Sequence, residues 1–391
     1  MSSRTRLSIL FVSTPVLAFV VVGGLIGQER SGEDRIYRHL RVFQEVVGLV
    51  KSNYVEEVQM DRAMEGAFRG LADNLDPDSA YLTAAQARSV AAGEKLPDGD
   101  VGLEITRQYY LRVIAARDGS PAAKAGLQTG DFIRAIDGRP TRDMSVFDGT
   151  RLLRGAPGSS VTLTIIRGNA AEPHEVSLVR ERAAGPLVTS RLLDEGVGYV
   201  RVSSFRNGVV EELRKHAAAV AKAGAQSILV DLRRTAEGPL ENGHQAARLF
   251  LKAGTLGVRA GRDAADRLEI TAKPNEGSID LPVTLLVTSG TSGAAELFVA
   301  ALDGNDRAEV LGERTLGRAG LQKLVPLPEN RGLWLTYQRY LTPAGEPIHG
   351  RGLEPDVRIE EPSLEFGAAA PEKDDMLDAA LSHIRTRRAA A

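Results

Sequence analysis

The stretch VTSGTSGAAELFVAALDGNDRAEVLGERTLGRAGLQ, residues 287–322, decides the fold of this chain. It leaves an apolar run, Val283–Thr288, through a turn rich in serine, threonine and glycine, and enters an apolar helical segment, Ala295–Leu302. A second apolar run follows at Ala308–Leu311. A short buried strand, a helix and another strand in this order are typical of an α/β domain.

The same alternation of strands and helices begins further upstream. Hydrophobic spacing predicts strands at Val197–Val202 and Ser227–Leu232, and helices at Val209–Ala223 and Gly243–Leu251. We therefore place the α/β domain at residues 186–360. A charged segment, Asp374–Arg387, predicts a final helix within the C-terminal tail, residues 361–391, where it packs or stays mobile.

Residues 97–185 have the pattern of a smaller domain. Ser120 and Pro121 predict the start of a short helix, and Gly126 predicts its end. The diagnostic text is GSPAAKAGLQTGD at 119–131, then Ile136-Asp137-Gly138, then Leu153-Arg154-Gly155, and a strand at Val161–Arg167. This series resembles a PDZ domain.

A PDZ domain binds an extended C-terminal peptide by strand addition, and backbone amides of a glycine loop take the carboxylate. The matching loop is Val101-Gly102-Leu103-Glu104. The resemblance therefore implies that Val101, Gly102 and Leu103 bind peptide. Glu104 places a negative charge beside this loop, so retained binding is an open expectation.

The N-terminal part of the chain predicts helices and a membrane segment. Apolar residues recur at helical spacing over Ile36–Asn53, and Asp61–Leu75 predicts a second helix, within a helical region at 34–95. Leu7–Gly27 is a run of 21 uncharged residues preceded by Arg4 and Arg6. About 20 apolar residues span a bilayer, so we expect an uncleaved signal anchor within residues 1–30, with a cleaved signal peptide as the alternative.

Residues 287–322 resemble the catalytic segment of the carboxyl-terminal processing peptidase (tail-specific protease) family. In that family a serine lies three residues before a glutamate, and a lysine lies twenty-five positions after the serine. Here the glutamate is Glu296, the serine position holds Gly293, and the lysine position holds Arg318, since 318 − 293 = 25. The family's third catalytic residue, a glutamine, corresponds to Gln322. The spacing is kept, but nucleophile and base are replaced.

The resemblance extends over roughly residues 36–360, including LDPDSAYL at 75–82, which nearly repeats the family's Leu-Asp-Pro-His-Ser turn. It implies an α/β (multidomain α+β) fold with an N-terminal helical region, a PDZ domain and a ClpP/crotonase-like α/β peptidase core. Glycine supplies no nucleophile, and guanidinium stays protonated, with a pKa above about 12. We therefore expect loss of the family's hydrolysis.

The oxyanion positions carry a further change. The family's Asp-Leu-Arg-x-Asn-Pro-Gly-Gly corresponds to DLRRTAEG at 231–238. By this resemblance the oxyanion positions are Glu237, Gly238 and Ala294, and the two expected donors are the N–H groups of Glu237 and Ala294. Glu237 replaces a glycine whose conformation only glycine adopts easily, and its charge opposes an oxyanion. An ion pair between Glu237 and Arg318 is a further hypothesis.

Ser292 beside the vacant position is an alternative nucleophile, with Lys323 as its base. The competing interpretation is that Ser292, Thr291 and Ser289 cap the following helix.

Composition excludes several other classes of function. The chain has 49 basic and 51 acidic residues, no cysteine and six scattered histidines. We therefore expect no nucleic-acid partner, no disulfide, no metal site and no cofactor.

The leading hypothesis is a pseudo-peptidase of the cell envelope, anchored in the inner membrane with its body on the periplasmic side. It binds protein C-termini through its PDZ domain, and it forms a homo-oligomer or assembles with an active family relative. One alternative is an active serine endopeptidase that uses Ser292 with Lys323. A second is a passive structural or oligomerisation protein of the envelope.

Overall fold

The computed structural model describes residues 36–168, 172–274, 277–362, 364–368 and 373–390. The predicted anchor at Leu7–Gly27 lies outside these residues. Within the described ranges no helix has the length and apolar character needed to cross a membrane. The chain divides into two compact units, residues 1–68 and 69–391.

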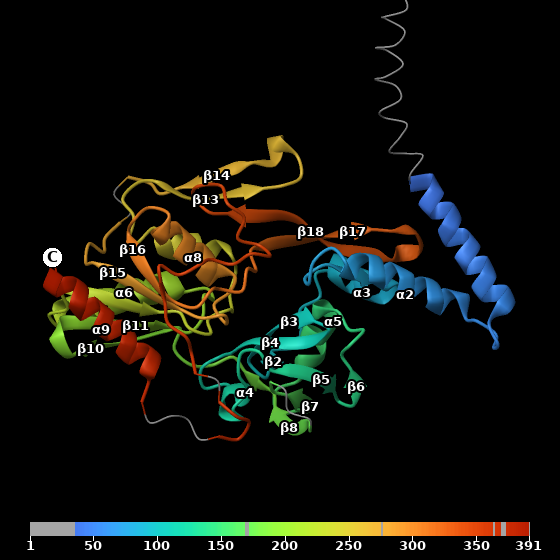
Figure 1. The fold of residues 1–391 in the computed structure, drawn as a ribbon, viewed down its shortest axis with the longest axis horizontal. Helices are drawn as coiled ribbons and strands as arrows, with labels where there is room; N and C mark the ends of the chain where they lie inside the picture. Colours follow the sequence, from blue (N-terminus) through green and yellow to red (C-terminus); the bar gives the residue numbers. More distant parts are fainter. Residues whose placement is uncertain (1–35, 169–171, 275–276, 363, 369–372, 391) are drawn as a thin grey trace, which may run out of the picture. The chain divides into compact units, whose positions relative to one another are not determined.

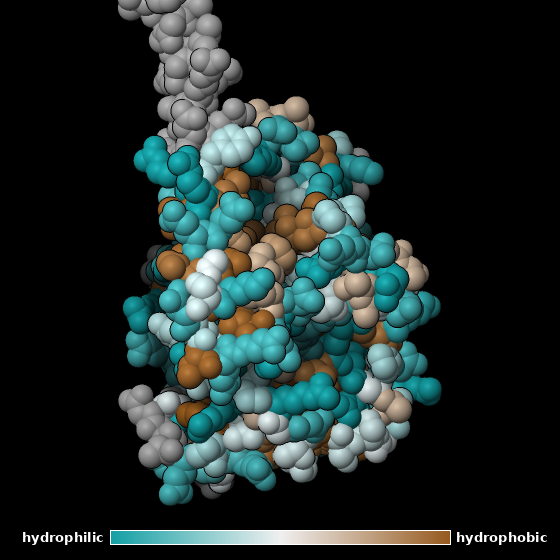
Figure 2. Space-filling view, turned by 90° about the vertical axis from the view of Figure 1, so that its right-hand side faces the viewer, coloured by the Kyte–Doolittle hydropathy of each residue, from teal (hydrophilic) through white to brown (hydrophobic). Residues whose placement is uncertain are grey.

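The first unit is helical where it is described. Residues 36–53 form one helix, and α2 (Met60–Asp73) begins in this unit. The first helix exposes much of its apolar side: Leu40 is 56% exposed and Leu49 is 61% exposed. Figure 2 shows one face of the molecule, on which hydrophobic residues lie exposed among hydrophilic ones.

The second unit begins with a turn and a sheet that frame the site. Strand β1 (Ala80–Leu82) precedes α3 (Ala84–Ala91), which Thr83 and Gln86 begin with a reciprocal capping box. The sheet has the order β1-β18-β13-β14, and β17 pairs with β18. The remaining strands of this sheet are β13 (Thr255–Ala260), β14 (Leu268–Thr271), β17 (Gly320–Pro326) and β18 (Gly332–Leu341).

The PDZ-like part has one antiparallel sheet in the order β3-β4-β5-β7-β8, with β6 paired to β5, and a separate two-stranded sheet of β2 and β9. Helix α5 (Val146–Leu153) packs against β3, and Ser145 caps its N-terminus. The other elements are β2 (Gly99–Asp100), β3 (Leu103–Gln108), β4 (Tyr110–Ala116), α4 (Pro121–Lys124), β5 (Phe132–Ile136), β6 (Arg139–Pro140), β7 (Ser160–Ile166), β8 (His174–Val179) and β9 (Glu181–Arg182).

The α/β core is a six-stranded sheet in the order β10-β11-β12-β15-β16-β19, parallel except for the β10–β11 pair (Figure 1). Helices α6, α7 and α8 contribute to the large hydrophobic cluster on one face. Its elements are β10 (Val188–Leu193), β11 (Val197–Val202), α6 (Val209–Lys222), β12 (Ser227–Asp231), α7 (Glu241–Ala247), β15 (Val283–Val287), α8 (Ala294–Asp303), β16 (Ala308–Gly312) and β19 (Val357–Arg358).

The C-terminal helix α9 (Asp375–Ala390) packs on the opposite face of this sheet, where Met376 and Ile384 join a second cluster. Its first turn is held by Asp374, which accepts the Leu377 N–H and pairs with Arg233 at 2.7 Å. Arg233 also pairs with Asp231 at the end of β12. Of the two expectations for this helix, the structure has the packed one.

The predicted α/β fold class with a PDZ domain is confirmed. One helix is shorter than predicted, because α7 ends at Ala247 and not at Leu251. Beyond it, the Leu249 and Phe250 N–H groups bond the carbonyls three residues earlier, which tightens the turn and ends the α-helix.

Candidate functional site

The site lies at the carboxyl end of β15, where the chain turns into α8. Gly293 is the last residue of this turn, with φ 66° and ψ −122°. A Cβ placed on Gly293 would lie 3.6 Å from the Ala236 carbonyl oxygen and 3.9 Å from the Arg318 carbonyl oxygen, which is ordinary contact. The position therefore has room for a side chain, although its backbone conformation is one that L-residues rarely adopt.

We expect Gly293→Ser to fold but to lower the free energy of unfolding by about 1–3 kcal/mol, because a left-handed φ strains any residue with a Cβ. Urea denaturation of the two proteins measures this difference. Gly70→Ser is the matched control, since Gly70 lies inside α2 with open space around it, and it is expected to be neutral or slightly stabilising. An unchanged midpoint in Gly293→Ser would contradict the strained turn.

Glu296 joins the two halves of the site. Its side chain is fully buried and accepts four hydrogen bonds, from the N–H groups of Gly293, Gly317 and Arg318 and from the Thr315 hydroxyl. Burial raises the pKa of Glu296, and these four donors oppose the rise. Glu296 thereby fixes the loop before β17 against the first turn of α8.

Arg318 is held by two carboxylates. Its Nε lies 3.0 Å from Asp78 Oδ1, in the turn before β1, and its Nη1 lies 3.4 Å from Glu104 Oε2, in β3. The negative charge of Asp78 raises the pKa of Arg318 above its usual value, so this guanidinium cannot accept a proton. The hypothesis that Arg318 pairs with Glu237 is wrong, because both of its contacts are to other acids.

Glu237 pairs instead with two arginines. Its Oε1 lies 3.2 Å from Arg117 Nη1, and its Oε2 lies 3.5 Å from Arg206 Nε. Glu237 itself has no left-handed φ, and the left-handed φ of 126° belongs to the next residue, Gly238. A Cβ on Gly238 would lie 2.3 Å from the Phe205 carbonyl carbon, so the glycine is required there.

The oxyanion donors are only partly in place. The Ala236 carbonyl oxygen faces the Gly293 position, as the 3.6 Å distance to a Cβ there shows. In a trans peptide the C=O and the following N–H point in opposite directions, so the Glu237 N–H is directed away from Gly293. The Ala294 N–H begins α8 and has no acceptor inside the helix. One of the two expected donors is therefore turned away from the site.

Ser292 is 1% exposed, and its Oγ has no hydrogen-bond partner among the described residues. Lys323 is exposed, and its ammonium lies over the Tyr337 ring, 4.7 Å from the centroid. The alternative dyad of Ser292 and Lys323 is therefore not assembled. The expected helix cap is also not formed, because no side chain caps the N-terminus of α8 at Gly293, and Thr291 Oγ1 donates to the Leu232 carbonyl.

Gln322 lies on β17 beside a register shift in the β17–β18 pairing. Its amide nitrogen donates to Thr336 Oγ1 at 3.1 Å. It is therefore held across the hairpin and not by a catalytic partner.

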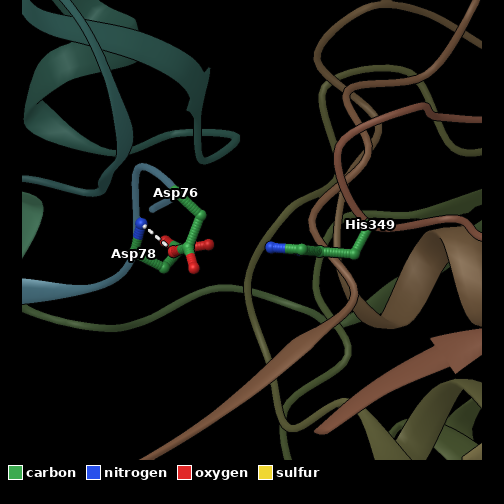
Figure 3. A group of neighbouring side chains, drawn as sticks. All are labelled: Asp76, Asp78 and His349. Carbon is green, nitrogen blue, oxygen red and sulfur yellow. Dashed lines mark hydrogen bonds between the residues drawn. The ribbon is translucent and has the colours of Figure 1, made fainter. Parts of the chain in front are cut away.

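Sequence reasoning missed the approach of His349 to the turn before β1. Asp76, Asp78 and His349 each place one ligand-type atom within 4.8 Å of the others. Figure 3 shows the His349 ring directed towards the two carboxylates. Both acids are already engaged, Asp76 by the N–H groups of Asp78 and Ser79 and Asp78 by Arg318. This group therefore supports no metal assignment.

The glycine loop of the PDZ-like part, Val101–Leu103, faces the same region. Gly102 has φ 76°, and a Cβ there would lie 2.2 Å from the Ser120 Cβ, so only glycine fits. A single pocket is lined by Val101, Gly102 and Leu103 from the loop and by Ala236 and Glu237 from the core. The loop and the former oxyanion position Glu237 thus line one pocket.

Two family models match the two parts of the chain. The Peptidase family S41 model matches residues 196–359, and the PDZ domain model matches residues 112–167. The carboxy-terminal-processing protease of Bartonella bacilliformis is 29% identical over 337 residues, 85% of this chain and 77% of that protein. The carboxyl-terminal-processing protease of Synechocystis sp. is 33% identical over 288 residues, 72% of this chain and 67% of that protein.

A solved structure shows the same fold. The photosystem II D1 C-terminal processing protease matches with a TM-score of 0.67 at 27% identity, over 80% of this chain and 85% of that chain. A PDZ domain joined to the six-stranded core sheet, with the turn after β15 held by Glu296, defines a PDZ-containing peptidase fold. The chain belongs to peptidase family S41, the family of the carboxyl-terminal processing proteases.

Proposed function

We propose that this chain is a pseudo-peptidase that binds protein C-termini through its PDZ domain and does not hydrolyse them. This proposal rests on the residues that stand at the two positions of the family's catalytic dyad, Gly293 and Arg318. Gly293 offers no nucleophile, and Arg318 is a charged partner of Asp78 and Glu104. Peptide hydrolysis by this family's chemistry needs a hydroxyl and a group that takes its proton, and neither is present at these positions.

Peptide binding by the PDZ domain is supported by the loop at Val101–Leu103, whose Gly102 has the conformation that such a loop needs. Val101, Leu103 and Leu153 give the neighbouring pocket an apolar lining. A tail with a free carboxylate and an apolar last residue therefore fits this site best.

We expect the full chain to bind such a tail without cleaving it. The test uses a fluorescein-labelled peptide that ends in Leu-Ala-Ala with a free carboxylate, and its C-terminal amide as the control. Anisotropy measures binding, and mass spectrometry of a disordered protein with the same tail measures cleavage. Ser292→Ala is expected to behave like the unmodified chain. Cleavage that disappears in Ser292→Ala would establish the active endopeptidase, and binding of neither peptide would favour the passive structural protein.

We infer further that the chain acts in the cell envelope, held by the predicted anchor at Leu7–Gly27, with its body on the periplasmic side. There it would compete for tails with an active relative or assemble with that relative. The uncharged run after Arg4 and Arg6 supports the anchor. Fractionation of cells that express the chain, with protease added to one side of the membrane, tests this location.

A further inference from the structure

The contact between Arg117 and Glu237 joins the PDZ domain to the peptidase-like core at the mouth of the peptide site. Arg117 follows β4, and its backbone N–H donates to the Gly102 carbonyl at 2.8 Å. Its Nη2 lies 3.3 Å from the place where a Cβ on Gly102 would be. The guanidinium therefore lies directly beside the loop that receives a tail's carboxylate.

The guanidinium is already occupied by carboxylates. Asp100, within the PDZ domain, lies 2.8 Å from Nη2, and Glu237, from the core, lies 3.2 Å from Nη1. Only 9% of the Arg117 side chain and 16% of the Glu237 side chain are exposed. A partly buried pair of this kind is screened weakly by solvent, so another anion must displace Glu237 to gain the same partner.

The small volume left in the pocket beside Arg117 is consistent with a carboxylate site that Glu237 already fills. The pocket between the loop and the core has about 40 Å³ of free volume. This is enough for water but far below the roughly 300 Å³ or more of pockets that hold small ligands. A tail carboxylate therefore reaches Arg117 in this space only when the Glu237 side chain leaves.

We propose that Arg117 is the charged half of the tail's carboxylate site, and that Glu237 occupies it as an internal substitute for a C-terminal carboxylate. This inference rests on the proposed tail binding. It gives the glutamate at a former oxyanion position a role of its own. The tail's carboxylate and the Glu237 carboxylate then compete for Arg117, so a tail binds there only when Glu237 has released Arg117.

Other contacts between the PDZ domain and the rest of the second unit do not involve Glu237. Arg318 pairs with Glu104, Arg201 pairs with Asp118 at 2.9 Å, and Arg167 donates to the Glu365 carbonyl at 3.3 Å. Because these contacts stay in place, Glu237→Gln removes the competing charge without removing the docking of the domain. The substitution therefore separates competition for the carboxylate site from docking.

We expect Glu237→Gln to lower the Kd of the full chain for the free-carboxylate Leu-Ala-Ala peptide by about tenfold, which corresponds to roughly 1.4 kcal/mol. The Kd for the amidated peptide is expected to stay unchanged, since the amide carries no charge for Arg117. Glu211→Gln makes the same change of net charge on the exposed surface of α6 and is the matched control, with no effect on either peptide.

Arg117→Gln is expected to bind both peptides equally, and Arg117→Lys to restore part of the preference for the free carboxylate. Circular dichroism of each variant checks that it is folded. Equal binding of the free-carboxylate peptide by the unmodified chain and by Glu237→Gln would overturn this inference and leave the proposed function intact. No binding by any folded variant would overturn both.

Discussion

Replacing Glu296 with alanine is expected to lower the free energy of unfolding by about 4 kcal/mol or more, a larger effect than most single substitutions have. The carboxylate is fully buried and accepts from Gly293, Gly317, Arg318 and Thr315. Its removal leaves three backbone N–H groups and one hydroxyl in the interior. A buried donor without an acceptor costs about 1–3 kcal/mol.

Glutamine at this position is expected to cost less than alanine but still about 2–3 kcal/mol, because each Glu296 carboxylate oxygen accepts two of the four donors. An amide nitrogen would face two of these donors, and the amide oxygen would keep the other two. Guanidinium chloride denaturation measures both variants. Glu211→Ala is the control, since Glu211 is exposed on α6, and its expected change is within about 0.5 kcal/mol. A loss below about 1 kcal/mol in Glu296→Ala would show that Glu296 does not hold the site together.

The preserved spacing from Gly293 to Arg318 was predictable from sequence, and Glu296 supplies its physical reason. Local patterns also predicted β12, β15 and α8, because each element buries a run of mostly apolar residues, and β11, because three of its valines are buried. The spacing from Gly293 to Arg318 is kept although both catalytic residues are replaced, because the hydrogen bonds that hold the two positions together join Glu296 to backbone N–H groups.

The partners of the substituted residues were not predictable in this way. Asp78 lies 240 residues before Arg318, and Glu104 lies 214 residues before it. No periodicity in the chain indicates that a turn, a PDZ strand and the loop before β17 meet at one guanidinium. The wrong pairing of Glu237 with Arg318 came from assuming that two charges at one former site must face each other.

The prediction that Ser292 caps α8 was wrong because it considered only residues next to the helix start. A serine before a helix predicts a cap only when its side chain can reach the first free N–H groups. Here Glu296 accepts the Gly293 N–H, so the first turn already has a side-chain acceptor, and Ser292 Oγ is buried without a partner in the part of the chain that the structure describes.

Restoring only the two catalytic residues, as Gly293→Ser/Arg318→Lys, is expected to give little hydrolysis at neutral pH. The introduced lysine would lie beside Asp78 and Glu104, which hold the arginine now. Opposite charges favour the protonated ammonium, so the pKa of this lysine would be raised above its usual value of about 10.4. Any activity should therefore rise with pH and stay low at pH 7, where a base needs a pKa near neutrality.

Hydrolysis should appear when the carboxylates are removed as well. Asp78→His introduces the residue of the family's Leu-Asp-Pro-His-Ser turn, Glu104→Gln removes the second charge, and Glu237→Gly lets the 236–237 peptide turn its N–H towards position 293. The variant that combines these three substitutions with Gly293→Ser/Arg318→Lys carries five substitutions. We expect it to cleave the tail-bearing disordered protein at least about 100-fold faster at pH 7 than the double variant does, since one oxyanion donor alone is worth about 10²–10³ in kcat.

The pH profile separates the two causes of inactivity. If the carboxylates control the base, adding Asp78→His and Glu104→Gln shifts the rising limb of the rate to lower pH, and Glu237→Gly raises the plateau without moving it. The same variants with Gly293 unchanged are the control and are expected to remain inactive. If the double variant is already fully active at pH 7, then Asp78 and Glu104 do not hold the basic group protonated, and the loss of activity rests on Gly293 and Arg318 alone.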